Sequence, residues 1–380
     1  MKQALIRAPI FTGDEWLEHR ALLLDGGLIK GLVAEDQVPT DYRVEDLHGT
    51  RLIPGLIDTQ VNGGGGALFN DAPTIDTLRT IGAAHRRFGT TGFLPTLISD
   101  DLDTGSRAMG AVHQATAEGV PGGWGRHREG PFRNPARKGV HDESKFRRPP
   151  PEAVDLLSSL DNGFTLVTLA PERTTPELIR DLSQRGVMVA AGHTAADYEQ
   201  TRTALAAGVR SFTHLFNAMT PMTSREPGVV GAALEDPDSW CGLIVDGYHV
   251  HAATRKVALA AKRRGKMVLV TDAMPTVGAQ NKQFTLKGET IHADNGRCAT
   301  ADGTLAGSDL DMLSAVRNTV AQLEQPLEEA LRMASLYPAQ MLGLDRELGR
   351  LAPGCRASLL AVDDQLRVKQ SWIDGAAQQF

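Results

Sequence analysis

The 380-residue chain has few cysteines and no long apolar run, and each shortage excludes a class of protein. Cys241, Cys298 and Cys355 are odd in number and far apart, which argues against a disulfide framework and a CxxC metal site, so we expect packing residues. No stretch approaches the roughly 20 apolar residues of a membrane span, and the first residues lack the apolar core of a signal peptide. We therefore expect a soluble cytoplasmic protein with no membrane partner.

An excess of positive charge is also missing. The chain has 40 Lys and Arg residues against 46 Asp and Glu residues, a formal net charge of −6. Such a balance gives no broad attraction to nucleic acid, although it permits a small basic pocket for an anionic metabolite. Residues 133–148 form a local basic run, whose simplest interpretation is a solvated loop.

The two ends of the chain share a pattern of short apolar runs separated by turn residues. Near the N-terminus the runs are 3–6, 21–24 and 28–33, and Asp25-Gly26 is typical of a hairpin turn. Near the C-terminus they are 357–362 and 368–373. We predict that residues 1–51 and 346–380 form one small β-sandwich domain.

Between the two ends, eight apolar runs alternate with segments of helical length. Continuous apolar runs are typical of a buried parallel sheet, and eight parallel strands close into a barrel. We therefore predict an α/β fold with a (β/α)8 TIM-type barrel over residues 52–345, interrupted by an inserted β-hairpin at 280–306. The expected strands are 52–57, 91–96, 122–128, 164–169, 187–192, 209–213, 242–245 and 267–271. The expected helices are 75–88, 101–118, 151–159, 176–185, 197–207, 252–264 and 309–322.

An ionisable residue directly follows each of four expected strands: Glu129, His193, His214 and Asp272. A lone histidine at a strand end is more often a hydrogen-bonded structural residue than a ligand. The combination is stronger, because one carboxylate and two imidazoles leave a position open for water, as in catalytic zinc sites. Asp272 could then exchange the proton of that water, or it could instead cap the next turn with Thr271.

Nine ordered motifs make nearly the whole chain resemble the N-acetylglucosamine-6-phosphate deacetylases of the amidohydrolase superfamily. The resemblance implies hydrolysis of the acetamido group of an amino-sugar 6-phosphate to acetate and the free amine. The motifs are Pro54-Gly55-Leu56-Ile57-Asp58, Glu129-Gly130-Pro131-Phe132, Lys138-Gly139-Val140-His141, Ala191-Gly192-His193-Thr194, Thr213-His214-Leu215-Phe216-Asn217-Ala218-Met219, Arg225-Glu226-Pro227-Gly228, Asp246-Gly247-Tyr248-His249-Val250, Thr271-Asp272-Ala273 and Leu305-Ala306-Gly307-Ser308.

The resemblance also implies roles for the residues of these motifs. Glu129, His193 and His214 are expected to bind one divalent ion per chain, zinc first, with iron, cobalt or manganese as alternatives. Asp272 is expected to be the catalytic acid/base, with His141 beside the scissile carbonyl. The expected substrate contacts are Val140, His141, Asn217, Ala218, Arg225, Asp246, His249, Leu305, Ala306 and Gly307.

Two of these contacts are expected at the phosphate. His249 and Arg225 occupy the family's phosphate-binding positions, with Arg225 reaching across the interface of a homodimer. A guanidinium suits this role because it presents paired donors to phosphate oxygens. The alternative for Arg225 is an ordinary surface ion pair with Glu226.

The chain departs from the pattern in two places. Many members of the superfamily carry His-x-His on the first strand to bind a second metal, but here the positions are Gln60 and Asn62, whose neutral amides are poor transition-metal ligands. The family also has leucine-like residues where this chain has Arg126, Arg128 and Arg133. By strand parity Arg126 and Arg128 face away from Glu129, toward the helices, where an unpaired guanidinium is costly.

Three functions remain open. The first is deacetylation of N-acetylglucosamine 6-phosphate. The second uses the same residues on the galactosamine epimer or on another cyclic amide. The third is a catalytically impaired sugar-phosphate binder, suggested by the arginines around Glu129. Metal content and acetate release distinguish the enzyme from the binder.

Overall fold

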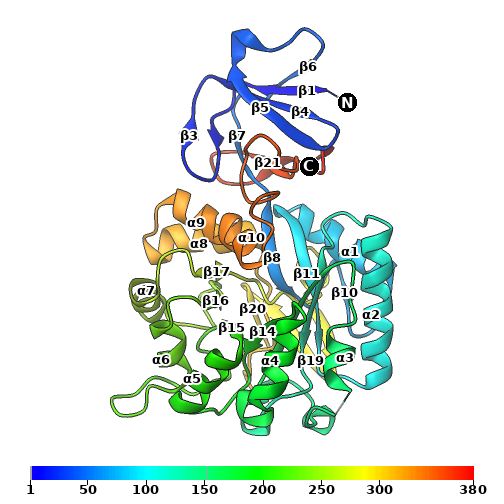
Figure 1. Cartoon of the computed structure of the whole chain (residues 1–380). Helices are drawn as coiled ribbons and strands as arrows, with labels where there is room; N and C mark the ends of the chain where they lie inside the picture. Colours follow the sequence, from blue (N-terminus) through cyan, green and yellow to red (C-terminus); the bar gives the residue numbers. More distant parts are fainter. Residues whose placement is uncertain (1, 151) are drawn as a thin grey trace.

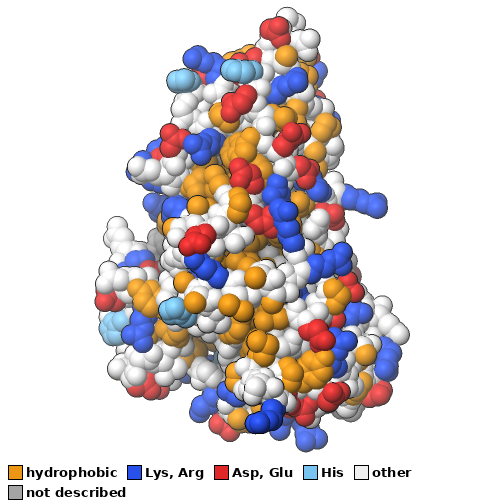
Figure 2. Space-filling model, turned by 90° about the vertical axis from the view of Figure 1, so that its left-hand side faces the viewer, with side chains coloured by type: hydrophobic (Ala, Val, Ile, Leu, Met, Phe, Trp, Pro, Cys, Tyr) orange, Lys and Arg blue, Asp and Glu red, His pale blue; other side chains and the backbone are white. Residues whose placement is uncertain are grey.

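The computed structural model describes residues 2–150 and 152–380, with the side chain of Leu102 also left out. The chain forms two lobes, a small all-β lobe built from both termini and a larger barrel (Figure 1). Charged side chains of both signs are interspersed over the face drawn in Figure 2. Among the described residues, no helix combines the length and apolar character needed to cross a membrane.

The small lobe consists of two sheets packed face to face. A four-stranded sheet has the order β5-β4-β1-β6 and a six-stranded sheet the order β23-β22-β21-β7-β2-β3. Trp372 is fully buried between them with Leu5, Leu22 and Leu359. The strands are β1 Gln3–Ile6, β2 Ile10–Phe11, β3 Trp16–Leu17, β4 Arg20–Asp25, β5 Leu28–Ala34, β6 Arg43–Asp46, β7 Arg51–Pro54, β21 Leu359–Val362, β22 Val368–Ile373 and β23 Ala376–Gln379, with a 3-10 turn, η1, at Glu35–Gln37.

Eight parallel strands form the barrel, in the order β17-β16-β15-β14-β13-β12-β11-β8. A parallel bridge between Val61 and Ala273 closes it, supported by hydrogen bonds from Asp272 N to Gln60 O and from Asn62 N to Ala273 O. The strands are β8 Leu56–Val61, β11 Thr90–Ile98, β12 Gly125–Glu129, β13 Phe164–Leu169, β14 Met188–Ala191, β15 Val209–Phe212, β16 Trp240–Leu243 and β17 Met267–Leu269.

Helices surround the barrel, and several of them begin at N-capping residues in the sequence. Thr175 caps α4 ahead of Pro176, and Asp197 forms a reciprocal capping box with Gln200 at the start of α5. The helices are α1 Ile75–Arg86, α2 Leu102–Ala117, α3 Ala153–Leu157, α4 Pro176–Gln184, α5 Tyr198–Ala207, α6 Gly228–Glu235, α7 Ala252–Ala261, α8 Met312–Leu323, α9 Leu327–Ala334 and α10 Leu336–Met341. Short 3-10 turns lie at η2 Pro135–Arg137, η3 Glu143–Lys145 and η4 Pro171–Arg173.

The carboxyl ends of the barrel strands face away from the small lobe. β8 starts two residues after β7, so the amino ends of the strands lie next to the small lobe and their carboxyl ends at the opposite end (Figure 1). Two short antiparallel sheets lie at that end. They are formed by β9 Gly63–Gly64 with β10 Ala67–Leu68, and by β18 Gln283–Leu286, β19 Glu289–Asp294 and β20 Arg297–Ala299.

The predicted barrel and the predicted hairpin at 280–306 are confirmed, and several bounds differ. The run 52–57 divides at Gly55 into β7, which belongs to the small lobe, and β8. Helices α6, α9 and α10 were not predicted, because they are short and α6 is buried along its length without an amphipathic face. The predicted helix 151–159 is present as α3, and its first residue lies outside the described residues. The division into 1–51, 52–345 and 346–380 is kept as a proposal.

Candidate metal centre and active site

Four ionisable residues lie at the carboxyl ends of barrel strands. Glu129 is the last residue of β12, His193 and His214 each follow two residues after β14 and β15, and Asp272 follows three residues after β17. The backbone φ angles of His193, His214 and Asp272 are 47°, 35° and 53°. Residues other than glycine rarely adopt this left-handed region, and such strain concentrates at functional sites. These turns aim the three side chains into the mouth of the barrel.

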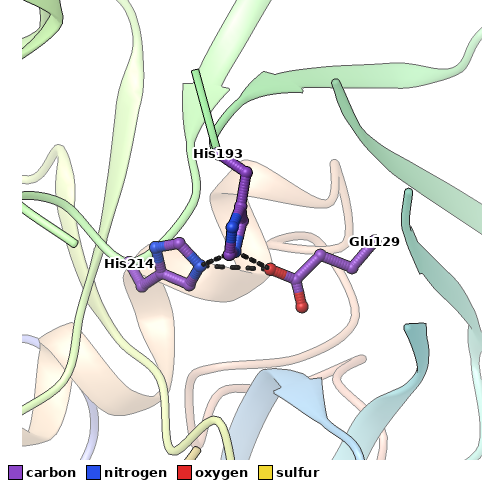
Figure 3. A group of neighbouring side chains, drawn as sticks. All are labelled: Glu129, His193 and His214. Atoms are coloured by element: carbon purple, nitrogen blue, oxygen red, sulfur yellow. Dashed lines mark hydrogen bonds and ion pairs between the residues drawn. The ribbon is translucent and has the colours of Figure 1, made fainter. Parts of the chain in front are cut away.

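Glu129, His193 and His214 converge on one point, as Figure 3 shows. Glu129 Oε1 lies 3.2 Å from His193 Nε2 and 3.1 Å from His214 Nε2, and the two imidazole nitrogens are 3.0 Å apart. All three side chains are buried. Burial and the Arg133 charge together lower the pKa of His193 to about 3. The pKa of His214 is instead raised, because its contact with Glu129 outweighs the effect of burial. The cluster therefore places two imidazole nitrogens beside one carboxylate.

The geometry of this cluster fits a metal ion. His193 Nδ1 lies 2.8 Å from the carbonyl oxygen of Arg137, which can only accept, so Nδ1 carries the proton and Nε2 presents its lone pair. That lone pair faces Glu129 Oε1 at 3.2 Å, and a cation bound between the two atoms would offset the repulsion between them. Bonds of about 2.0–2.1 Å to a tetrahedral zinc ion separate ligand atoms by about 3.4 Å, close to the spacings found here.

Asp272 is held by the side-chain amides of Gln60 and Asn62, which lie at the carboxyl end of β8. Asn62 Nδ2 donates to Asp272 Oδ1 at 2.6 Å, and Gln60 Nε2 donates to the same oxygen at 3.1 Å. Gln60 Nε2 also lies 3.2 Å from Glu129 Oε2, so one amide links the two carboxylates. Burial and the nearby Glu129 charge raise the pKa of Asp272 to about 6. Sequence reasoning considered Gln60 and Asn62 only as missing metal ligands and overlooked this contact.

A cavity of about 180 Å³ opens at the barrel mouth above these groups. His141 lies at its wall, with its ring centroid 4.8 Å from that of His193 in an edge-on arrangement. The segment that follows β20 contributes Leu305 and Gly307. The predicted site residues that line the cavity are Glu129, Val140, His141, His193, His214, Asn217, Ala218, His249, Asp272, Leu305 and Gly307. Asn62, Ile98, Gly139 and Met274 also line it and were not predicted.

The structure leaves three predicted contacts away from the cavity wall. Ala306 is fully buried and donates its N–H to Cys298 O, which holds the hairpin segment in place. Asp246 Oδ2 lies 2.6 Å from His249 Nδ1, so Asp246 orients a ring that does line the cavity. Arg225 is exposed on the segment before α6, and within the described residues no ion pair joins it to Glu226.

The three unexpected arginines lie in two different places. Arg126 and Arg128 face the helices, as strand parity predicts: Arg126 Nη2 donates to Leu157 O at 2.9 Å, and Arg128 Nε donates to Gly130 O at 3.2 Å. Across residues 2–150 and 152–380, neither has a carboxylate within ion-pair distance, and Arg126 Nε and Nη1 have no hydrogen-bond partner. Burial and neighbouring positive charge lower the pKa of each to about 10. Arg133, in contrast, lies beside Glu129.

Comparison with known proteins shows which family the chain belongs to. The amidohydrolase family model matches residues 51–378, and the model of the NagA composite domain matches residues 3–52. The chain belongs to the amidohydrolase family. A curated N-acetylgalactosamine-6-phosphate deacetylase from Shewanella sp. (strain ANA-3) is 40% identical, over 97% of this chain and 94% of that protein.

Solved amidohydrolase-family structures share the whole architecture. The crystal structure of N-acetylglucosamine-6-phosphate deacetylase from Pasteurella multocida has a TM-score of 0.96 and 34% identity, and covers 100% of both chains. A variant of the Mycobacterium smegmatis N-acetyl-D-glucosamine-6-phosphate deacetylase, solved in complex with N-acetyl-D-glucosamine 6-phosphate, has a TM-score of 0.91 and 32% identity, and covers 99% of both chains. The resemblance drawn from the sequence motifs is confirmed, and the chain is a hydrolase of carbon–nitrogen bonds.

Proposed function

We propose that the chain hydrolyses the acetamido group of N-acetylglucosamine 6-phosphate to glucosamine 6-phosphate and acetate. One observation carries this proposal: three convergent metal-ligand atoms and the Asp272 carboxylate line a single cavity at the barrel mouth. The relatives named for N-acetylglucosamine 6-phosphate deacetylation support the substrate. We further propose that the reaction takes place in the cytoplasm.

The ligand set of the proposed metal centre is Glu129, His193 and His214. A divalent ion held there supplies Lewis-acid activation of a water molecule and of the amide carbonyl. Two imidazoles and a carboxylate suit zinc, while iron, cobalt and manganese accept the same donors. One ion per chain is proposed, because Gln60 and Asn62 are committed to hydrogen bonds with Asp272.

Asp272 is proposed to move the proton. With its pKa raised to about 6, it is a carboxylate at neutral pH and accepts a proton from the attacking water. It then delivers that proton to the amine as the carbon–nitrogen bond breaks, so the water is divided between acetate and the amine. His141 lies on the cavity wall beside His193 and is proposed to hydrogen-bond the substrate near the scissile carbonyl.

The phosphate end of the substrate is proposed to meet His249 and Arg225. His249 is oriented by Asp246, while Arg225 is exposed and away from the cavity of its own chain. This separation favours the proposal that Arg225 reaches a second copy of the chain in a homodimer. Val140, Asn217, Ala218, Leu305, Ala306 and Gly307 are proposed to shape the sugar subsite.

The galactosamine epimer is the second candidate substrate, favoured by the 40% identical Shewanella relative that carries its name. The test is acetate release from both N-acetylhexosamine 6-phosphates and from the two unphosphorylated sugars, with zinc supplied. We expect the highest kcat/KM for N-acetylglucosamine 6-phosphate. A higher kcat/KM for the galactosamine epimer would show that this epimer is the substrate. Binding of the sugar phosphate without acetate release would show that the protein is a binder and not an enzyme.

A further inference from the structure

Arg133 is a fully buried arginine beside the proposed metal centre. Its Nη2 lies 3.0 Å from Glu129 Oε1, and both side chains are almost completely shielded from solvent. Its backbone is fixed by its neighbours, since Ala170 N donates to Phe132 O and Asn134 N donates to His193 O. The guanidinium is therefore held against the carboxylate by the ends of two barrel strands.

Glu129 is the only carboxylate that the described residues place within ion-pair distance of Arg133. None of the three guanidinium nitrogens makes a hydrogen bond of good geometry within that part of the chain. A buried charge without hydrogen bonds depends on its ion partner, and removing one member of such a pair strands the other. Arg133 and Glu129 therefore neutralise each other in the protein without metal.

The pair shares the oxygen that faces the histidines. Glu129 Oε1 lies 3.0 Å from Arg133 Nη2 and also forms the 3.2 Å and 3.1 Å contacts with His193 and His214. A divalent ion at this cluster would bind a carboxylate whose charge is already offset, with a fixed positive charge nearby. Partners that raise the basicity of a metal ligand strengthen metal binding by about 10- to 100-fold, and a cation that lowers this basicity is expected to weaken binding by a similar factor.

We propose that Arg133 is a built-in counter-ion of Glu129 that stabilises the metal-free barrel and makes the metal ion exchangeable. The inference rests on the metal site of the proposed function and adds a property to it. A leucine-like residue at this position would leave Glu129 to the metal alone. Arg133 thus weakens binding of the metal ion, and it stabilises the fold when no metal ion is bound.

The test compares neutral and charged replacements of Arg133 by metal affinity and by unfolding. Zinc affinity is measured by competition with a chromophoric chelator, and thermal unfolding is followed with and without zinc. We expect Arg133→Met and Arg133→Gln to bind zinc about 10- to 100-fold more tightly than the wild type. Both should unfold at lower temperature without metal and gain a larger increase in Tm from zinc, because ligand binding adds stability according to affinity.

Two controls separate charge from packing. Arg133→Lys keeps the positive charge and should bind zinc within about threefold of the wild type, whereas a merely structural role would make Lys resemble Met. Arg126→Met removes another buried arginine of the same stretch that does not touch Glu129, and should leave zinc affinity unchanged.

The outcomes also separate this inference from the proposed function. Unchanged or weaker zinc affinity in both neutral variants, with acetate release intact in the wild type, overturns the counter-ion role alone. If the wild type holds zinc weakly and the neutral variants hold it tightly, the counter-ion role stands. If neither the wild type nor the variants bind any divalent ion, both the inference and the metal-dependent function fail.

Discussion

Asn62 Nδ2 lies 2.6 Å from Asp272 Oδ1 and holds that carboxylate at the barrel mouth. The two residues come from the junction that closes the barrel, where Asn62 N also donates to Ala273 O. The Asn62 side chain therefore supports the proposed acid/base. Its amide proton favours the charged form of Asp272 and opposes the rise in pKa that burial causes.

Asp272→Asn should abolish most turnover while metal binding persists. An amide cannot accept the proton of the attacking water, and loss of a general acid/base typically lowers the rate about 10²- to 10⁴-fold. Asp272 is not part of the Glu129, His193 and His214 cluster, so metal content should not fall. Steady-state acetate release beside elemental analysis checks both parts. Turnover within a few fold of the wild type would assign Asp272 another role.

Titration of the metal-free protein with zinc, followed by competition with a chromophoric chelator, should saturate at one divalent ion per chain. Gln60 and Asn62 carry neutral amides, which are poor transition-metal ligands, and both amides donate hydrogen bonds to Asp272. A second ion therefore lacks ligands. Glu129→Ala is the matched control and should remove the ion, because it deletes the carboxylate of the cluster. Two tightly held ions in the wild type would contradict this prediction.

The sequence predicted the position of a site residue where the periodicity of a β-strand determines that position. Glu129 at the end of its strand and the outward direction of Arg126 follow from the two-residue period of a β-strand and from the rule that barrel chemistry lies at carboxyl ends. The Arg133–Glu129 contact was out of reach, since it depends on how the chain turns after Gly130. Gly130 has a φ of 115°, and a Cβ there would lie 2.2 Å from Ser99 Oγ.

Arg225→Ala should weaken the binding of phosphorylated sugars far more than that of unphosphorylated ones. The charge-assisted contact exists only with the phosphate, so KM for the 6-phosphates should rise while the poor activity on free sugars stays the same. Mixing Arg225→Ala with Asp272→Asn tests the proposed interface. At substrate concentrations well below the raised KM, hybrid dimers should regain activity if Arg225 acts in the partner's site, and should keep only the weakened activity of Arg225→Ala if it acts within its own chain.

Asp58→Asn should increase stability at neutral pH more than at acidic pH. Burial raises the pKa of Asp58 to about 7, so the folded protein binds this proton more tightly than the unfolded chain does. The stability that the proton provides is complete below about pH 4 and is lost as the pH rises to about 7, a difference of up to about 4 kcal/mol.

An asparagine can keep the geometry of Asp58. Asp58 Oδ1 accepts the N–H groups of Gln60 and Thr271 at 3.1 Å and 3.3 Å, which an amide oxygen also does. Its Oδ2 accepts from Thr271 Oγ1 at 2.5 Å, and an amide nitrogen there would donate to the same hydroxyl. Urea unfolding of both proteins at pH 4.5 and pH 7.5 checks the prediction. An advantage that does not grow with pH would show that Asp58 is ionised at little cost.

The last prediction concerns Arg126 and Arg128, which lie between the barrel and its helices. Both are 5% exposed, and they line a small crevice whose walls are mostly apolar, including Leu97, Ala108 and Val112. Their only side-chain hydrogen bonds in the described part of the chain reach backbone carbonyl groups. Neither guanidinium therefore has a charge partner that would offset its burial.

Arg126→Leu/Arg128→Leu should raise the free energy of unfolding by about 1 to 4 kcal/mol, the range found when buried ionic groups are replaced by packed apolar ones. Most of the gain should come from Arg126→Leu, because Arg126 Nε and Nη1 are buried without partners. Arg180→Leu, an exposed position on α4, is the matched control and should change stability by less than about 0.5 kcal/mol. Chemical denaturation of the single and double variants measures each value. A loss of stability in Arg126→Leu would mean that its 2.9 Å hydrogen bond to Leu157 O outweighs the cost of the buried charge, and that this strand depends on arginine to hold α3 in place.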